Sequence, residues 1–169
     1  MWKMPEKKSI VINTGPILAL VAALGDLKVL KTLYDEIIIP FEVCHEIRQG
    51  GKTGFAIQEF EQASWLLKQT KKTKIPPFLA SSLDPGEASV IETALQNKIS
   101  TVCIDEAVGR RIARLHQLTL TGSIGILIKA KNTGYQINMM ESLEQMKAQG
   151  IWLSDRVVKF ALEQTTTDK

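Results

Sequence analysis

Cysteine is scarce in this sequence, with only Cys44 and Cys103 among 169 residues. Each lies within an apolar stretch rather than in a framework of paired loops, so we expect two buried thiols and no disulfide. A small secreted fold held together by disulfides is therefore excluded. The same usage is typical of a reducing compartment, and we expect a cytoplasmic protein.

Long apolar runs are also missing. The longest, residues 17–24, is far shorter than the roughly 20 residues that a helix needs to cross a bilayer. Residues 1–8 contain neither the apolar region nor the small-residue cleavage site of a signal peptide. We expect no membrane span and no secretion.

Aromatic residues make up only 6% of the chain, and the net charge is a mild +3. So few aromatic side chains argue against a sequence-specific RNA reader that stacks bases. The charge permits an anionic partner without requiring one. Apolar residues at 44% and charged residues at 23% are near globular norms, and we expect residues 1–169 to form one domain.

Strand and helix patterns alternate along the chain. β-branched and apolar runs predict strands, and apolar residues at helical spacing predict helices between them. Repeated alternation with apolar strands indicates an α/β fold with a mostly parallel sheet covered on both faces. Strands are predicted at 9–12, 36–40, 101–104 and 118–120, and helices at 17–24, 27–34, 41–49, 55–63, 87–96, 106–116, 123–131, 139–149 and beyond 154.

Four polar residues stand at strand exits or on the helices that follow, namely Asn13, Glu46, Glu87 and Asp105. The carboxyl ends of parallel strands meet at one edge of a sheet, where ligands bind. Carboxylates gathered there repel one another, and a divalent cation that prefers oxygen ligands relieves this repulsion. We therefore expect these four side chains to form a catalytic site around Mg²⁺ or Mn²⁺.

Each of these residues also has a purely structural interpretation. Asp84 and Glu87 fit a capping box at the start of a helix, with Pro85 in the first helical position. Asp105 can cap the helix beginning at Glu106, and Asn13 or Thr14 can cap the helix entered through Pro16. Glu46 can be an ordinary solvated glutamate. Capping and metal ligation exclude each other only in part, so both interpretations stay open.

Four segments of the chain resemble a known family, the PIN domain of metal-dependent ribonucleases. They cover residues 11–20, 39–47, 83–88 and 104–127. The resemblance is to a DUF3368-like branch of prokaryotic proteins that are often paired with small antitoxins. It implies a three-layer α/β/α sandwich whose acids hold Mg²⁺ or Mn²⁺ for cutting RNA.

The resemblance also implies a role for each candidate. Glu46 corresponds to the second acid of the family, Glu87 to the third and Asp105 to the fourth. Asn13 stands where most PIN nucleases have the leading aspartate. An amide supplies an oxygen ligand without a charge, so we expect weaker metal binding here.

Basic residues offer possible contacts to nucleic acid. Arg110, Arg111 and Arg114 lie on one side of a helix, and a second basic patch covers residues 68–74. Ser123 begins a helix near the same edge, where it can contact a phosphate or serve as the N-cap. Solvated charge explains the basic residues almost as well as phosphate contacts do.

Two functions remain from different classes. One is a metal-dependent endoribonuclease, the toxin component of a toxin–antitoxin pair, in which a metal-activated water attacks the phosphodiester. The other is a catalytically weakened module that binds RNA or a protein through the same face. A zinc site is improbable because the two histidines, His45 and His116, lie far apart without cysteine spacing. The apolar faces of the terminal helices, including Met139, Met140, Leu143 and Met146, fit either the core or a homodimer surface.

Overall fold

A computed structural model describes residues 7–165 of the chain. Its centre is a five-stranded sheet in the order β3-β2-β1-β4-β5. All four pairs of neighbouring strands are parallel, which confirms the predicted α/β fold with a mostly parallel sheet. The strands are β1 (Ser9–Ile12), β2 (Glu36–Ile39), β3 (Leu66–Lys68), β4 (Thr101–Cys103) and β5 (Thr119–Thr121).

The central strand β1 is apolar on both of its faces because helices cover both sides of the sheet. Ile10, Val11 and Ile12 are fully buried. Ile10 stands opposite Ile37 of β2, and Val11 opposite Val102 of β4. Stiff β-branched side chains suit this doubly buried position, and they explain why the sequence predicts the strand so clearly.

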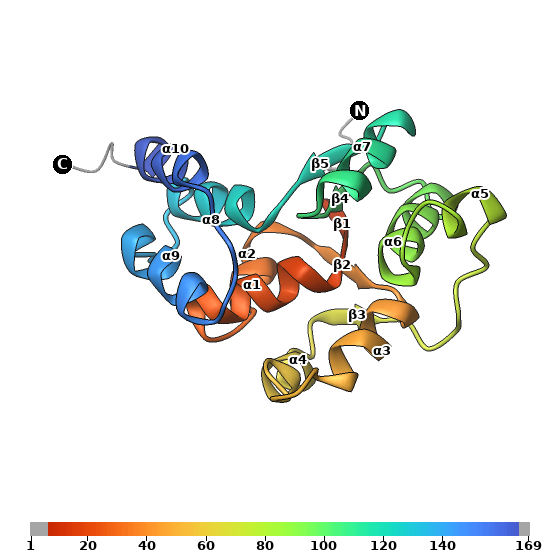
Figure 1. The fold of residues 1–169 in the computed structure, drawn as a ribbon, viewed down its shortest axis with the longest axis horizontal. Helices are drawn as coiled ribbons and strands as arrows, with labels where there is room; N and C mark the ends of the chain where they lie inside the picture. The colour runs from red at the N-terminus through yellow and green to blue at the C-terminus, as the bar shows by residue number, and fades with distance from the viewer. Residues whose placement is uncertain (1–6, 166–169) are drawn as a thin grey trace, which may run out of the picture.

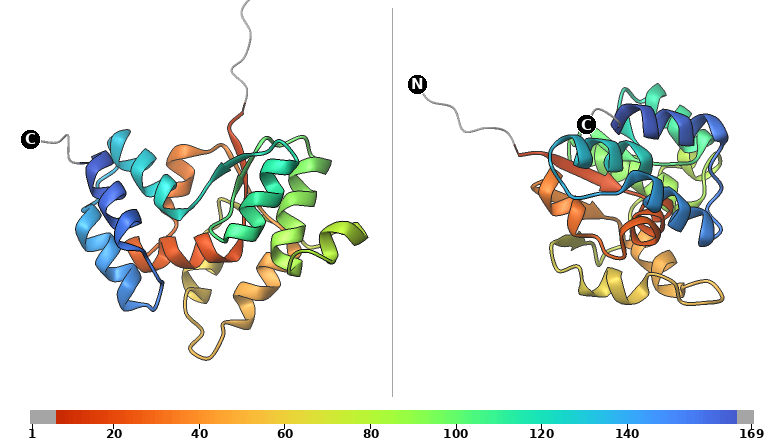
Figure 2. Two further views of the ribbon diagram at one scale, coloured as in Figure 1. Left: turned by 45° about the horizontal axis from the view of Figure 1, so that its top comes forward. Right: turned by 90° about the vertical axis from the view of Figure 1, so that its left-hand side faces the viewer.

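The helices form two layers, one on each side of the sheet (Figures 1 and 2). One layer holds α3, α5, α6 and α7, with α6 packed on β1 and β4; the other holds α1, α2, α8, α9 and α10. The arrangement is the expected α/β/α sandwich. The helices are α1 (Thr14–Leu24), α2 (Lys28–Leu33), α3 (Phe41–Gln49), α4 (Ile57–Gln62), α5 (Pro77–Ala80), α6 (Pro85–Gln96), α7 (Ala107–Leu115), α8 (Ser123–Asn132), α9 (Met139–Ala148) and α10 (Asp155–Thr165).

The position of α9 shows whether its methionines belong to the core or to an exposed surface. Met139, Leu143 and Met146 are buried in the core, whereas Met140 is 48% exposed. The apolar face of α9 packs against α1 and α10, so it is core. Within residues 7–165, no helix has both the length and the apolar character needed to span a membrane.

Several local predictions are confirmed. The Asp84 carboxylate accepts a hydrogen bond of 2.8 Å from the backbone N–H of Glu87, so Asp84 caps α6. Asn138 caps α9 in the same way through the N–H of Glu141. Cys44 and Cys103 are free and buried. The short helix α5, which begins at Pro77, has no counterpart among the predicted elements because four residues are too few to show a helical period.

Candidate functional site

The candidate site lies where the order of the strands reverses. The chain leaves β1 towards β2 on one side and leaves β4 towards β5 on the other. Connections that diverge in this way open a crevice at the carboxyl ends of the two strands. Asn13 follows β1 directly, and its N–H donates to the carbonyl of Cys103 at the end of β4, 3.1 Å away. Asp105 and Glu106 follow β4 at the same edge.

Three carboxylates meet at this edge. Asp84, Glu87 and Glu106 each offer an oxygen, and these oxygens all lie within 4.8 Å of one another. Glu87 is only 4% exposed, while Asp84 and Glu106 are open to solvent. The cap of α6 positions two of them, because Asp84 is the N-cap and Glu87 is the third residue of the helix. Glu106 comes from the start of α7.

Gly86 marks the point where two further predicted residues join the cluster. A Cβ at this position would stand 2.7 Å from Oε2 of Glu46, 3.2 Å from Oδ1 of Asn13 and 3.5 Å from Oδ1 of Asp84. Oxygens from β1, α3 and α6 therefore surround one small residue. Of the four residues predicted from sequence, the fold brings Asn13, Glu46 and Glu87 into one cleft together with Asp84.

Gly109 on α7 leaves space for the carboxylate of Glu87, as Gly86 does for Glu46 and Asn13. A Cβ there would lie 2.8 Å from Oε2 of Glu87 and 3.0 Å from the side chain of Ile104. Any larger residue at this position would compete with Glu87 for space. Glycines on α6 and α7 thus allow both helices to close on the acids.

The electrostatics of Glu87 show how crowded the acids are. Burial, hydrogen bonds with Asp84 and Glu106, and their negative charges raise the pKa of Glu87 to about 9. The N-terminus of α6 would by itself favour a carboxylate by about 0.3–1 kcal/mol. The pKa rises nonetheless, so burial and the neighbouring acids outweigh the helix dipole.

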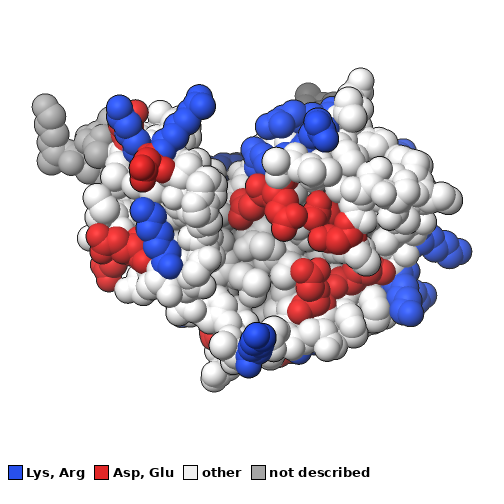
Figure 3. Space-filling model, viewed as in Figure 1, with Lys and Arg blue, Asp and Glu red and all other residues white. Residues whose placement is uncertain are grey.

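Glu46, on the other side of the cleft, is also affected by the negative charge of the neighbouring acids. Desolvation, followed by the charge of Asp84, raises the pKa of Glu46. Figure 3 shows acidic side chains gathered in two bands that face each other across the hollow. No basic side chain contributes to the pKa of Glu46 or of Glu87 within the described part of the chain.

Two buried oxygens at this site have no hydrogen-bond partner among residues 7–165. They are Oδ1 of Asn13 and Oγ1 of Thr14, on residues that are each 6% exposed. The Thr14 hydroxyl lies close enough to Glu46 to lower the pKa of that carboxyl, but the pair does not reach hydrogen-bonding geometry. Buried polar atoms without a protein partner are costly unless a water or an ion satisfies them. Oxygens from carboxylates, an amide and a hydroxyl are the donor set of a hard divalent cation, so these residues fit Mg²⁺ or Mn²⁺.

Asp105 is not among the carboxylates whose oxygens meet within 4.8 Å, although desolvation and the charge of Glu106 both raise its pKa. Its two carboxylate oxygens accept hydrogen bonds from the backbone N–H and the hydroxyl of Ser123, at 2.8 and 2.9 Å. Desolvation raises the pKa of Asp105, and the two bonds from Ser123 oppose that rise. Gly122 makes the approach possible, because a Cβ there would stand 2.6 Å from Oδ1 of Asp105. Asp105 therefore ties the exit of β4 to the start of α8.

The structure corrects three of the predicted caps. Glu106, not Asp105, is the N-cap residue of α7. Gly122, not Ser123, is the N-cap residue of α8, and Ser123 uses its hydroxyl on Asp105. Asn13 is the N-cap residue of α1, but its side chain makes no capping bond. The predicted N-cap position of Asn13 is confirmed, but its amide oxygen lies beside the acids of the cleft and not on the N–H groups of α1.

The arginines of α7 divide into two kinds. Arg110 donates from Nη1 to the carbonyl of Ile104 at 2.7 Å and to that of Thr121 at 3.3 Å, so it joins β4 and β5 to α7. Arg111 and Arg114 are exposed. Arg110 also lines a hollow of about 580 Å³ beside Asp105, together with Trp152, which is 84% exposed.

The sequence does not predict that Asp84 and Glu106 belong to the cluster. Asp84 fits a capping box, and Glu106 is adjacent to Asp105, which follows the strand predicted at 101–104. A signal was nevertheless present, because two acids flank Pro85-Gly86 and two more follow β4 directly. Glycines next to acids are a further sign of close packing around a site.

Comparison with known proteins gives a family. The model of the DUF3368 family, described as a PIN domain, matches residues 9–167. No curated protein and no solved structure matches the chain.

Proposed function

The chain belongs to the PIN-domain family, and from this premise we propose that it is a metal-dependent endoribonuclease that hydrolyses phosphodiester bonds. The observation that supports the proposal most strongly is the meeting of Asp84, Glu87 and Glu106 beside the unpartnered Oδ1 of Asn13. Acids packed this closely without a cation destabilise the fold, so their retention in one cleft favours a ligand-binding role.

In this proposal the metal ligands come from Asn13, Glu46, Asp84, Glu87 and Glu106. Glu87 is central because it is buried and within reach of both Asp84 and Glu106. Mg²⁺ or Mn²⁺ bound here would supply Lewis acidity and an activated water. Asp105 keeps its place in the proposed site as the residue that positions Ser123 and the start of α8 next to the ligands.

We also propose that the protein is the toxin component of a toxin–antitoxin pair in the cytoplasm. A small antitoxin protein is the proposed partner, and a homodimer is compatible with the same face. The exposed Trp152 and Phe160 beside Asp105 support this part of the proposal, because exposed aromatic residues in a hollow are typical of protein interfaces.

Cleavage of RNA by the purified protein tests the nuclease. We expect products with Mg²⁺ or Mn²⁺ and none with EDTA. Glu87→Gln should lower the rate by at least about 100-fold, the upper range for loss of a residue that merely supports a metal ligand. Glu92→Gln is the matched control, because Glu92 lies on the same helix and contacts Gln96 outside the cluster. Equal rates for the two variants would contradict the assignment of Glu87.

The alternative is a catalytically weakened module that binds RNA or a protein. The observation that favours it is Asn13, which brings an oxygen to the cleft but no charge. Salt-sensitive RNA affinity without cleavage under any of the metal conditions would establish this alternative.

A further inference from the structure

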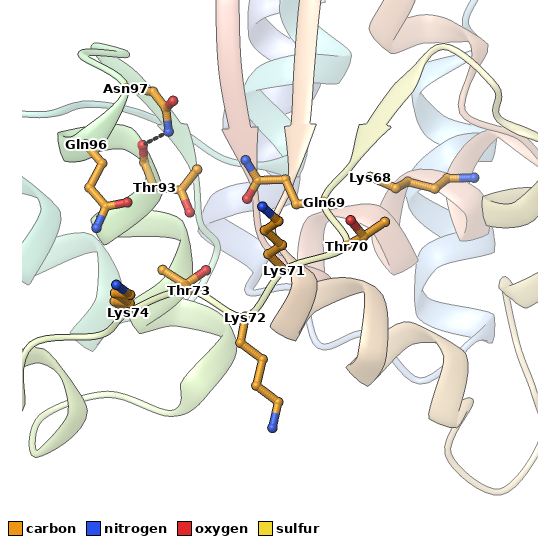
Figure 4. Close-up of a pocket in the computed structure, with 10 residues that line it drawn as sticks. All are labelled: Lys68, Gln69, Thr70, Lys71, Lys72, Thr73, Lys74, Thr93, Gln96 and Asn97. Carbon is orange, nitrogen blue, oxygen red and sulfur yellow. Dashed lines mark hydrogen bonds between the residues drawn. The ribbon is translucent and has the colours of Figure 1, made fainter.

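A second polar hollow lies beside the candidate site, between α6 and the chain that connects β3 to α5. It has a volume of about 540 Å³. Residues 68–74 form one wall, and Thr93, Gln96 and Asn97 at the end of α6 form the other (Figure 4). We call it the lysine groove.

The lysine groove is basic and contains no acidic residue among those that line it. Lys71, Lys72 and Lys74 are exposed, and none of them has a hydrogen bond or an ion pair with any described residue. Lys68 is different, because its ammonium lies 4.6 Å from the centre of the Phe60 ring. Three uncompensated positive charges thus stand within four consecutive residues, although the whole chain carries only +3.

The side chains of the groove point in different directions. Figure 4 shows Lys71 directed towards Gln69 and Lys74 lying below Gln96, whereas the side chain of Lys72 extends away from both. Gln69 and Gln96 line the same groove as these two lysines. Ammonium and amide groups together are typical ligands for the phosphates and sugars of a nucleic-acid backbone.

Two elements connect the lysine groove rigidly to the acid cleft. On α3, the Glu42 carboxylate accepts hydrogen bonds of 2.8 Å from both the N–H and the hydroxyl of Thr73, and Glu46 lies one helical turn further on. On α6, Thr93 follows Glu87 by six residues, which corresponds to about 9 Å along the helix axis. The loop is therefore held in place next to the proposed catalytic residues.

We propose that the lysine groove binds the phosphodiester backbone of the RNA strand on one side of the bond to be cut. This inference rests on the proposed function and adds the path that the RNA strand takes across the protein surface. A lysine ammonium binds phosphate as a point charge and does not contact base edges. No aromatic side chain lines the groove to stack on bases. Binding there is therefore independent of base sequence. The positive groove also offsets the repulsion between the acid cleft and an approaching polyanion.

The test uses a labelled single-stranded RNA about 20 nucleotides long, bound in EDTA and followed by fluorescence anisotropy over a range of salt concentrations. Lys71→Ala/Lys74→Ala should weaken binding about 10-fold at low salt. It should also reduce the slope of log K against log salt by about 1.4, the value for two lost phosphate contacts on a single strand. Lys28→Ala/Lys147→Ala is the matched control, since it removes the same charge from two exposed lysines on α2 and α9, in the helix layer on the other side of the sheet.

Two results would overturn the proposal. The first is unchanged affinity in the Lys71/Lys74 variant, which would leave the groove free for another partner such as an acidic protein. The second is an equal loss in the matched control, which would mean that only net charge matters. Because binding is measured without metal, a failure of the nuclease proposal leaves this test intact.

Kinetics provide a second, independent readout. In the Lys71/Lys74 variant we expect a raised KM for RNA with nearly unchanged kcat. Hydrolysis of bis(p-nitrophenyl) phosphate, which is too small to reach the groove, should stay at the level of the unmodified protein. A fall in hydrolysis of this small substrate would place the two lysines in the catalytic site and contradict the proposal.

Discussion

Glu87 is the residue on which the candidate site depends most. It is buried, it follows the α6 cap, and it touches acids from two helices. Its raised pKa means that the folded protein without metal holds a proton there at neutral pH. A divalent cation bound here would compete with that proton for the same oxygens, so its binding would release a proton.

The pH dependence of stability follows from this residue. Below the ordinary pKa of 4.5, Glu87 is protonated in both the folded and the unfolded chain and has no effect. As the pH rises towards about 9, the unfolded chain ionises more readily than the folded one, so the free energy of unfolding falls. Above that range the loss is complete. Urea denaturation in EDTA across this window should show the decline.

Glu87→Gln provides the check on that assignment. The amide keeps the shape and carries no titratable proton, so the decline with pH should be much smaller and the variant should be more stable than the parent at high pH. The rise in the pKa of Glu46 and of Asp105 leaves a residual slope. Glu92→Gln should behave like the parent, and an equally flat profile for it would rule Glu87 out as the source.

Asn13 and Asp105 show how two polar residues at neighbouring strand ends serve different purposes. Oδ1 of Asn13 is buried without a partner, whereas both oxygens of Asp105 are satisfied by Ser123. Oδ1 of Asn13 thus accepts no hydrogen bond from a described residue, whereas each oxygen of Asp105 accepts one and keeps a second lone pair. This contrast is why Glu87 rather than Asp105 is the first residue to substitute.

At the scale of elements, α6 organises the site. Its N-cap supplies Asp84, its first turn supplies Glu87, and Gly86 between them leaves space for Glu46 and Asn13. The same helix packs on β1 and β4 and carries one wall of the lysine groove at its other end. One rigid helix thus relates the proposed catalytic residues to the proposed substrate path.

Gly86→Ala should weaken metal binding at the site without unfolding the protein. Alanine is the better helix former by about 0.5–1 kcal/mol, and the closest obstacle is the flexible end of Glu46, so the fold should be retained. The new methyl group would displace Oε2 of Glu46 and crowd Oδ1 of Asn13. We expect the affinity for Mn²⁺, measured by calorimetry, to fall about 10-fold or more, a loss of about 1.4 kcal/mol.

Gly15→Ala is the matched control for this variant. Gly15 also lies in the first turn of a helix beside the site, but a Cβ there meets nothing within 4 Å. It should bind Mn²⁺ as the parent does. If both variants lost affinity equally, helix propensity rather than access to the cleft would be the cause.

At the scale of the whole molecule, the reversal of strand order gathers residues that are far apart in the sequence. Asn13 follows β1, Glu46 comes from α3, and Glu106 follows β4. These elements become neighbours only when the sheet is complete, so a ligand that holds them binds the folded chain alone. Such a ligand stabilises the entire domain by mass action.

Thermal unfolding tests this linkage. Mn²⁺ at about 100 times its dissociation constant should contribute about 2.7 kcal/mol. For a chain of this size that corresponds to an increase in Tm of roughly 5–10 °C. At one fixed Mn²⁺ concentration, the increase in Tm should be larger at pH 8 than at pH 6, because Glu87 gives up its proton more readily at the higher pH. A shift of the same size in Glu87→Gln would show that the metal binds elsewhere.

The alternation of strands and helices could be predicted from sequence because it depends on local periodicity. The apolar run of β1 and the capping box at Asp84 both have short-range signatures, and both are confirmed. The failures also have physical causes. Helix α5 is too short to display a period, and the N-cap residues of α7 and α8 lie one position away from those predicted, as is common at helix ends.

The sequence by itself determined that acids would stand at the carboxyl edge of a parallel sheet, because strand ends and helix starts depend on local residue patterns. Only the tertiary structure decided which of those acids meet. Asp105 and Glu106 are adjacent in the chain, yet Asp105 bonds to Ser123, 18 residues further on, whereas Glu106 joins Asp84 and Glu87. The partners of a carboxylate are set by the direction of its side chain and by neighbours brought through space, and neither is a property of the sequence around it.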